Sequence, residues 1–383
     1  MDGPEARELF LLCQPVAGAA DAGEQAEAIY RAALAVLEAE GGSFEAVVCE
    51  TLFVRSLQAD LERIRAARDR ILAACSAPHH RPAITEIEQP PLSERALEVS
   101  LQAVLPLPTG SRLCVDAVSR ALRVQLGDEV RLYAGGLYGA GDAYQQTLAM
   151  FGVAEELLQQ AGMEFRDVVR TWIHLREIDR DYADLNRARR AFFESRGIEP
   201  APASTGVGGG PVPAGHDLCL GVYAVRAAAR TVMSTSLLND AASYGADFER
   251  GIRLAETNKV ALHVSGTASI DAAGRTAHPL DFEAQATRML QNVSDLLAGQ
   301  GAGFADVVSA ITYLRHPADA GRLRNKLREA GFEGFPHALV AAPLCRPDLL
   351  CETEALAVLS RSLTQDGGGK ARATRRGGGE ARD

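Results

Sequence analysis

The chain repeats one short motif three times: Ser43-Phe44-Glu45-Ala46-Val47-Val48, Glu164-Phe165-Arg166-Asp167-Val168-Val169 and Gly303-Phe304-Ala305-Asp306-Val307-Val308. Each copy follows a stretch with helical spacing of apolar residues and opens an apolar run of strand length. The second copy lies 121 residues after the first, and Cys219 follows Glu98 in the closing strands by the same 121 residues. Such spacing indicates repeated structural units.

The residues around each motif predict how a unit is built. Before the third motif, Ala286, Met289, Leu290 and Val293 recur at three- and four-residue steps, which gives a helix one apolar face. Strand-like runs open and close each unit, and a second helical stretch follows each motif. The order strands, helix, strand, helix, strands predicts an α+β fold in which a mixed β-sheet carries two helices on one face.

Three predicted units share this layout, and they span residues 8–105, 121–228 and 243–361. The segments between them, residues 105–120 and 227–242, carry small or polar residues and are predicted to be linkers. Residues 364–383 contain two Gly triplets among charged residues. Because this segment has too little apolar surface to bury, we expect a disordered tail.

Composition narrows the classes of function. The chain of 383 residues is 47% hydrophobic and 23% charged, an ordinary mixture for a globular protein. Its formal charge of -10 argues against a nucleic-acid partner. The acidic start and the lack of a long uncharged apolar run predict a cytoplasmic protein that has neither a secretory signal nor a membrane span. Seven scattered cysteines without a CxxC pair favour reduced thiols over disulfides or a metal site.

The closing strand of the third unit, residues 349–358, carries two carboxylates on one face. Glu352 and Glu354 are two residues apart among apolar neighbours, the spacing that places side chains on one side of a strand. Burial raises the pKa of a carboxyl group towards neutrality, which suits proton donation. We interpret Glu352 as a proton donor and Glu354 as structural. The alternative for Glu352 is a carboxylate that a neighbouring Arg neutralises.

The repeated unit, with the FxDVV motif after a helix and the closing pattern E-x-E-A-x-A-V, resembles the RidA/YjgF family. That resemblance implies a chorismate-mutase-like unit that assembles as a trimer with ligand sites between units. Three units in one chain then imply an intrachain pseudo-trimer. The protein is expected to be a monomer with internal pseudo-threefold symmetry, or a weak homo-oligomer.

Further motifs in the second and third units are similar to those of the chorismatases. Six occur in the same order, namely Arg170-Thr171-Trp172, Tyr182 through Asn186 to Arg189, Pro202 to Gly209, Tyr244-Gly245 with Phe248 and Arg250, Ser265 to Ile270, and Arg346 through Asp348 to Glu352. The resemblance implies a hydrolase that releases pyruvate from chorismate, a substrate with two carboxylates, and needs neither an organic cofactor nor a metal.

The resemblance also implies roles for individual residues. Glu352 matches the catalytic acid, and Cys345 is assigned with it as a catalytic residue. Cys345 and Gly266 also match the branch that forms 3-hydroxybenzoate. The implied substrate-binding residues are Tyr182, Arg189, Thr205, Arg250, Gly266 and Arg346. Read without the resemblance, a thiol such as Cys345 is a packing residue, and any single Arg is a solvated surface charge.

Two departures from the family pattern keep alternatives open. The first unit is a full repeat where chorismatases carry a divergent N-terminal part, which allows another substrate. Imine-hydrolysing relatives use an Arg near the position of His337, which this chain lacks. The alternatives are a RidA-like hydrolase of imines, enamines or another small metabolite, and a protein that binds metabolites without turnover.

Overall fold

The computed structural model describes most of the three predicted units. The described residues are 6–15, 21–75, 80–106, 113–118, 121–235, 237–238, 247–257 and 259–360. The predicted tail, residues 364–383, and the Tyr244-Gly245 pair lie outside them. Within the described residues, no helix combines the length and the apolar character that crossing a membrane requires.

The first sheet has the strand order β1-β4-β2-β3-β10 and carries helices α1 and α2. Strands β2 and β3 run parallel and the pairs β1–β4 and β2–β4 antiparallel, so the sheet is mixed. The short strand β10 comes from the second unit and extends this sheet by pairing with β3. The elements are β1 (Ala6–Cys13), α1 (Ala22–Ala39), β2 (Val47–Val54), α2 (Leu57–Ala73), β3 (Ala83–Glu88), β4 (Leu97–Pro106) and β10 (Gly210–Pro211).

The second sheet repeats this plan with one additional hairpin. Its strand order is β5-β6-β7-β11-β8-β9, and its helices are α3 and α4. The elements are β5 (Leu113–Val118), β6 (Ala121–Leu126), β7 (Glu129–Leu137), α3 (Ala143–Gln160), β8 (Val168–Leu175), α4 (Ile178–Arg196), β9 (Ala203–Gly208) and β11 (Leu218–Arg226).

The third sheet has the strand order β12-β13-β14-β17-β15-β16 and carries α5 and α6. Strands β15 and β16 pair in parallel, whereas β17 runs antiparallel to both of its neighbours. The elements are β12 (Ala229–Val232), β13 (Gly251–Ala255), β14 (Lys259–Ala268), α5 (Phe282–Ala298), β15 (Val307–Leu314), α6 (Ala320–Glu329), β16 (His337–Ala341) and β17 (Cys351–Ser360).

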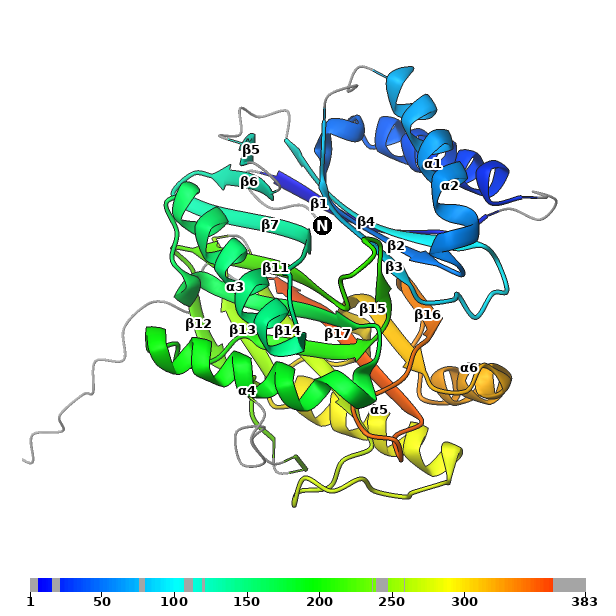
Figure 1. The fold of residues 1–383 in the computed structure, drawn as a ribbon, viewed down its shortest axis with the longest axis vertical. Coiled ribbons are helices and arrows are strands. Elements are labelled where there is room, and N and C mark those ends of the chain that lie inside the picture. The colour runs from blue at the N-terminus through cyan, green and yellow to red at the C-terminus, as the bar shows by residue number, and fades with distance from the viewer. Residues whose placement is uncertain are drawn as a thin grey trace, which may run out of the picture.

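The three sheets face one another, and their helix pairs lie on the outside (Figure 1). Each helix pair buries its apolar stripe against its own sheet, and the core of the third unit also takes Phe53 from the first unit and Val207 from the second. A fourth cluster lies between the sheets and takes Val48 from the first, Tyr133 from the second and Ile252 from the third. This arrangement confirms the predicted α+β fold and the intrachain pseudo-trimer.

The predicted linkers are wrong in part. Strand β5 lies inside the first, and it pairs antiparallel with β6, with Asp116 and Arg123 in an ion pair of 3.2 Å. Strand β12 lies inside the second and pairs with β13. Both strands are at the edge of their sheets, where polar residues remain exposed. Their composition therefore resembles that of a linker although their backbone groups are paired.

Strand register relates the three closing strands. In each sheet the closing strand pairs with the strand that opens at the repeated motif, and equivalent pairs are Phe53 with Glu98, His174 with Cys219, and Tyr313 with Glu352. The position of Glu352 is therefore occupied by Glu98 in the first sheet and by Cys219 in the second. The fold itself does not require an acid there.

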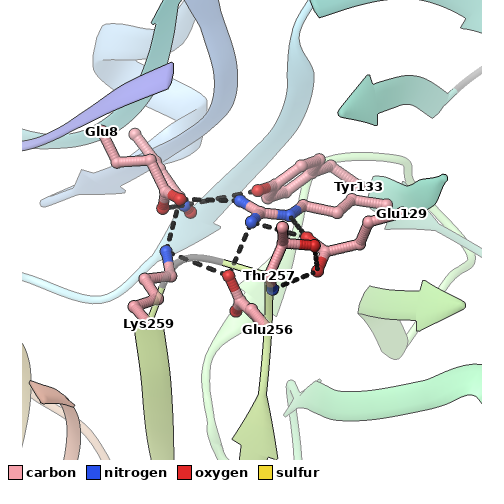
Figure 2. A network of polar contacts seen from close by, with 8 residues as sticks. Glu8, Glu129, Tyr133, Glu256, Thr257 and Lys259 are labelled. Carbon is pink, nitrogen blue, oxygen red and sulfur yellow. Dashed lines mark hydrogen bonds and ion pairs between the residues drawn. The ribbon is translucent and has the colours of Figure 1, made fainter. Parts of the chain in front are cut away.

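A buried ionic cluster joins the three units (Figure 2). Arg131 of β7 contacts Glu8 of β1 at 2.7 Å, Glu256 beside β14 at 2.6 Å and Glu129 at 2.7 Å. Lys259 binds Glu8 as well and lies 3.3 Å from Glu256. All five side chains are buried. Each unit supplies at least one partner, so these contacts fix the units relative to one another.

Replacing Arg131 by Met is expected to lower the free energy of unfolding by about 3–5 kcal/mol, because three buried carboxylates lose their main partner. Urea denaturation measures this change. The matched control is Arg31→Met, since Arg31 forms an exposed pair with Glu27 on α1 and its loss should leave the midpoint close to that of wild type. Equal midpoints for Arg131→Met and wild type would show that the cluster does not stabilise the assembly.

Candidate active site

A cavity of about 320 Å³ lies between the second and third units. Helix α4 and strand β9 line it from the second unit, and strands β14 and β17 with the loop before β17 line it from the third. Seven of the eight predicted site residues line this cavity, namely Tyr182, Arg189, Arg250, Gly266, Cys345, Arg346 and Glu352. Sequence segments up to 170 residues apart therefore meet at one site.

Glu352 lies on β17 and faces this cavity with only 5% of its surface exposed. Among the described residues, no group forms a hydrogen bond or an ion pair with its carboxyl. Burial and the negative charge of Glu354 raise the pKa of Glu352 to about 8, against the opposing charges of Arg250, Arg170 and Arg346. The group is therefore mostly protonated at neutral pH and able to donate a proton.

Glu354, two residues further along β17, is held by protein donors instead. Its carboxylate accepts hydrogen bonds from Arg170 at 2.9 Å, from the indole of Trp172 at 2.7 Å and from the hydroxyl of Tyr313 at 3.2 Å. These contacts tie β17 of the third unit to β8 of the second. The geometry agrees with a structural role for Glu354 and leaves Glu352 as the carboxyl of the pair that faces the cavity.

Gly266 has no side chain, and this leaves room for the carboxyl group of Glu352. Gly266 lies where the pairing of β14 with β17 shifts register, between Val264 and Thr267. A Cβ atom at residue 266 would lie 2.0 Å from Oε1 of Glu352, so any larger residue would require the carboxyl to move.

The predicted binding residue Thr205 does not line the cavity. Its hydroxyl accepts hydrogen bonds from the amide of Gly266 at 2.9 Å and from Arg170. Thr205 therefore holds the backbone of Gly266, which does line the cavity.

Three arginines surround the cavity from three different segments. Arg189 of α4 and Arg250 before β13 both lie 5.6 Å from the ring centroid of Phe248. Arg189 donates to the side chain of Asn186 at 2.7 Å, and Arg346 donates to the carbonyl of Gly274 at 2.7 Å. These contacts orient planar groups that suit bidentate binding of carboxylates.

The helical spacing of α4 explains two of the lining residues. Tyr182 and Arg189 are seven positions apart, which places them on one face of the helix as predicted. Arg187 and Arg190 of the same helix are exposed. The separation of lining and solvent-facing arginines on α4 therefore follows from periodicity alone.

Cys345 lines the cavity beside Glu352 as a neutral thiol. Burial, with a further contribution from the charge of Glu352, raises the pKa of Cys345 to about 12, although a hydrogen bond with Tyr182 acts in the opposite direction. A thiol with this pKa is not a nucleophile at neutral pH. Its position fits a residue that shapes the cavity.

Further lining residues, including Phe248, Asn186, Ser204 and Leu349, lie in the motifs quoted above, but the sequence alone assigned them no role in the site. Asn186 follows Tyr182 by four residues, so helical periodicity could have identified it. The others lie next to predicted residues in loops or strands, where no spacing rule applies.

Within the described residues, no three His, Cys, Asp or Glu side chains are grouped so that they could hold a metal ion.

Comparison with known proteins relates the second and third units to one family. The family model described as endoribonuclease L-PSP matches residues 127–225 and 246–359, which together exceed half of the chain. A chorismatase from Streptomyces rapamycinicus is 28% identical over 251 residues, 58% of this chain and 72% of that protein. A 3-hydroxybenzoate synthase from Streptomyces hygroscopicus is 26% identical over 250 residues, with the same two coverages.

A solved chorismatase structure has the same fold, with a TM-score of 0.64 and 18% identity, and matches 92% of this chain and 99% of that one. The unmatched 8% is much shorter than the first unit, so a counterpart of that unit exists in the solved structure. The divergence expected for the first unit therefore concerns its sequence, while its fold has a counterpart in that structure. From its matches to the family model, the chain belongs to the endoribonuclease L-PSP (RidA) family.

Proposed function

We propose that this protein is an enzyme of the chorismatase type that releases pyruvate from chorismate, with Glu352 as the proton donor. The observation that carries the proposal is a buried carboxyl that forms no hydrogen bond or ion pair with another described residue. Its pKa is raised to about 8, and it faces a cavity lined by three arginines. The names of two relatives, chorismatase and 3-hydroxybenzoate synthase, support the choice of substrate.

The charges of the cavity complement those of chorismate. Arg189, Arg250 and Arg346 are cations, and a protonated Glu352 adds no negative charge that would repel a dianion. A cavity of about 320 Å³ falls within the range of small-molecule sites. In this proposal Arg189 and Arg250, which flank Phe248, bind the carboxylates, and Arg346 approaches from the loop before β17.

The reaction begins with proton transfer to carbon. Glu352 donates its proton to the terminal methylene of the enol ether, the carbon–carbon double bond is consumed, and an oxocarbenium ion forms. The Glu352 carboxylate that remains stabilises this cation electrostatically. Cleavage of the bond between the ring carbon and the ether oxygen, or attack of water on the cation, then gives pyruvate.

Two products are possible from this intermediate. Addition of one water yields pyruvate and a dihydroxycyclohexadiene carboxylate. Attack from within the ring followed by aromatisation yields pyruvate and 3-hydroxybenzoate without net consumption of water. We infer the aromatic product, because Cys345 fills the space beside Glu352 and Gly266 leaves the carboxyl room at the strand irregularity.

Incubation of the pure protein with chorismate is expected to release pyruvate, measured with a coupled lactate dehydrogenase assay. Glu352→Gln should lower the rate by at least about 100-fold, since an amide cannot supply the proton. The rate should also fall as the pH rises through about 8, where the carboxyl of the wild-type protein ionises.

The matched control is Glu98→Gln, which removes the acid at the same register position of the first sheet. Glu98 is buried but does not line the cavity, so this variant should retain the wild-type rate. Unchanged pyruvate release from Glu352→Gln would contradict the assignment. Ammonia release from an imino acid, with no pyruvate from chorismate, would favour the imine-hydrolase alternative.

Replacing Cys345 by Ala is expected to change the product more than the rate. The smaller side chain opens space next to Glu352 for a water molecule, which favours addition of water over aromatisation. Chromatography of the products should show the share of 3-hydroxybenzoate fall while pyruvate release continues. An unchanged product ratio would show that Cys345 only packs against the wall.

A further inference from the structure

Ser265 of β14 is fully buried next to the candidate active site and does not line its cavity. The Ser265 hydroxyl accepts a hydrogen bond from the amide of Ser204 on β9 at 2.9 Å. It donates one to the carbonyl of Glu249, just before β13, at 2.5 Å. Because Ser204 belongs to the second unit and Glu249 to the third, one hydroxyl group joins the two units beside the cavity.

The backbone of Ser265 holds the same segment of the third unit. Its amide donates to the carbonyl of Arg250 at 3.0 Å, so Ser265 binds two successive residues of this segment. The amide of Glu249 in turn donates to the carbonyl of Pro202 at 3.1 Å, which ties the segment to the second unit. Since Arg250 lines the cavity, these contacts determine where its side chain starts.

The second sheet has the same strand irregularity without a hydroxyl group. The register of β7 and β11 shifts between Ala134 and Leu137, as the register of β14 and β17 does at the equivalent place. Gly135 therefore takes the position of Ser265. A Cβ atom at Gly135 would lie 2.8 Å from the carbonyl oxygen of Ile84 on β3, so a side chain at this position would collide with the backbone of the first unit.

The boundary between the second and third units is built differently. There a side chain has room, and the Ser265 hydroxyl offers an acceptor to Ser204 and a donor to Glu249. Backbone amides and carbonyls require such partners, because a buried one without a hydrogen bond is unfavourable. The hydroxyl therefore sets the separation between β9 and residues 249–250, and both Ser204 and Arg250 line the cavity.

We propose that Ser265 is a positioning residue, whose hydroxyl holds Arg250 at the cavity by bridging β9 and residues 249–250. Ser265 does not touch the substrate and acts on it through Arg250. The inference rests on the proposed function, in which Arg250 binds a carboxylate of chorismate.

Steady-state kinetics of pyruvate release from chorismate test the proposal. Ser265→Ala should raise KM at least about tenfold, because Arg250 is displaced, and lower kcat less than about threefold, because Glu352 still donates the proton. Ser265→Cys keeps a side chain of similar size but has only a weak donor, so it should also raise KM. The matched control is Ser269→Ala. Ser269 is equally buried and donates to the carbonyl of Ala277 at 2.8 Å, so this variant should keep the wild-type KM and kcat.

Crystal structures of the variants give a second readout that needs no turnover. In Ser265→Ala the guanidinium of Arg250 should move by at least about 1 Å, a displacement large enough to disturb substrate binding, and in Ser269→Ala it should stay in place. If the wild-type protein releases no pyruvate, the proposed function fails and this comparison still decides the role of Ser265. Arg250 in its wild-type position in Ser265→Ala would overturn the proposal. So would a wild-type KM for Ser265→Cys, because filled volume rather than hydrogen bonding would then be what matters.

Discussion

The candidate site depends on one buried carboxyl group, that of Glu352, which accepts no hydrogen bond from any of the residues that the structure describes. It lies two residues from Glu354, a carboxylate that accepts three hydrogen bonds. Loss of hydration disfavours the ionised form of Glu352, and the charge of Glu354 disfavours it further. Arg170 and Trp172 hold Glu354 in place, so the second unit fixes the electrostatic surroundings of an acid on the third. The acidity of Glu352 is thus a property of two units together.

The triplicated architecture explains how one chain can build a single specialised site. Three equivalent register positions carry Glu98, Cys219 and Glu352, but among the described residues only Glu352 combines an acid with the arginine-lined cavity. In one polypeptide each unit can diverge by itself, which identical subunits cannot do. The ionic cluster around Arg131 then fixes the orientation of the diverged units.

The sequence predicts those features that follow from local periodicity. The repeated motif located the three units, and the spacing of Tyr182 and Arg189 placed both on one face of a helix. Their assignment to the site came from the resemblance to chorismatases. Features made by contacts between units were not predictable, such as the pairing of Glu8 with Lys259 across 251 positions. Thr205 shows the same limit, because its sequence neighbours do not reveal that its hydroxyl turns towards Gly266 and Arg170. The edge strand β5 was missed since its exposed side resembles a linker.

The most direct test of this account is a titration of the Glu352 carboxyl carbon by NMR, with the signal assigned by its loss in Glu352→Gln. The account predicts a midpoint of about 8, well above the ordinary 4.5. A midpoint near 4.5 would mean that the group is an ionised carboxylate at neutral pH. Glu352 would then lack the proton on which the proposed chemistry depends.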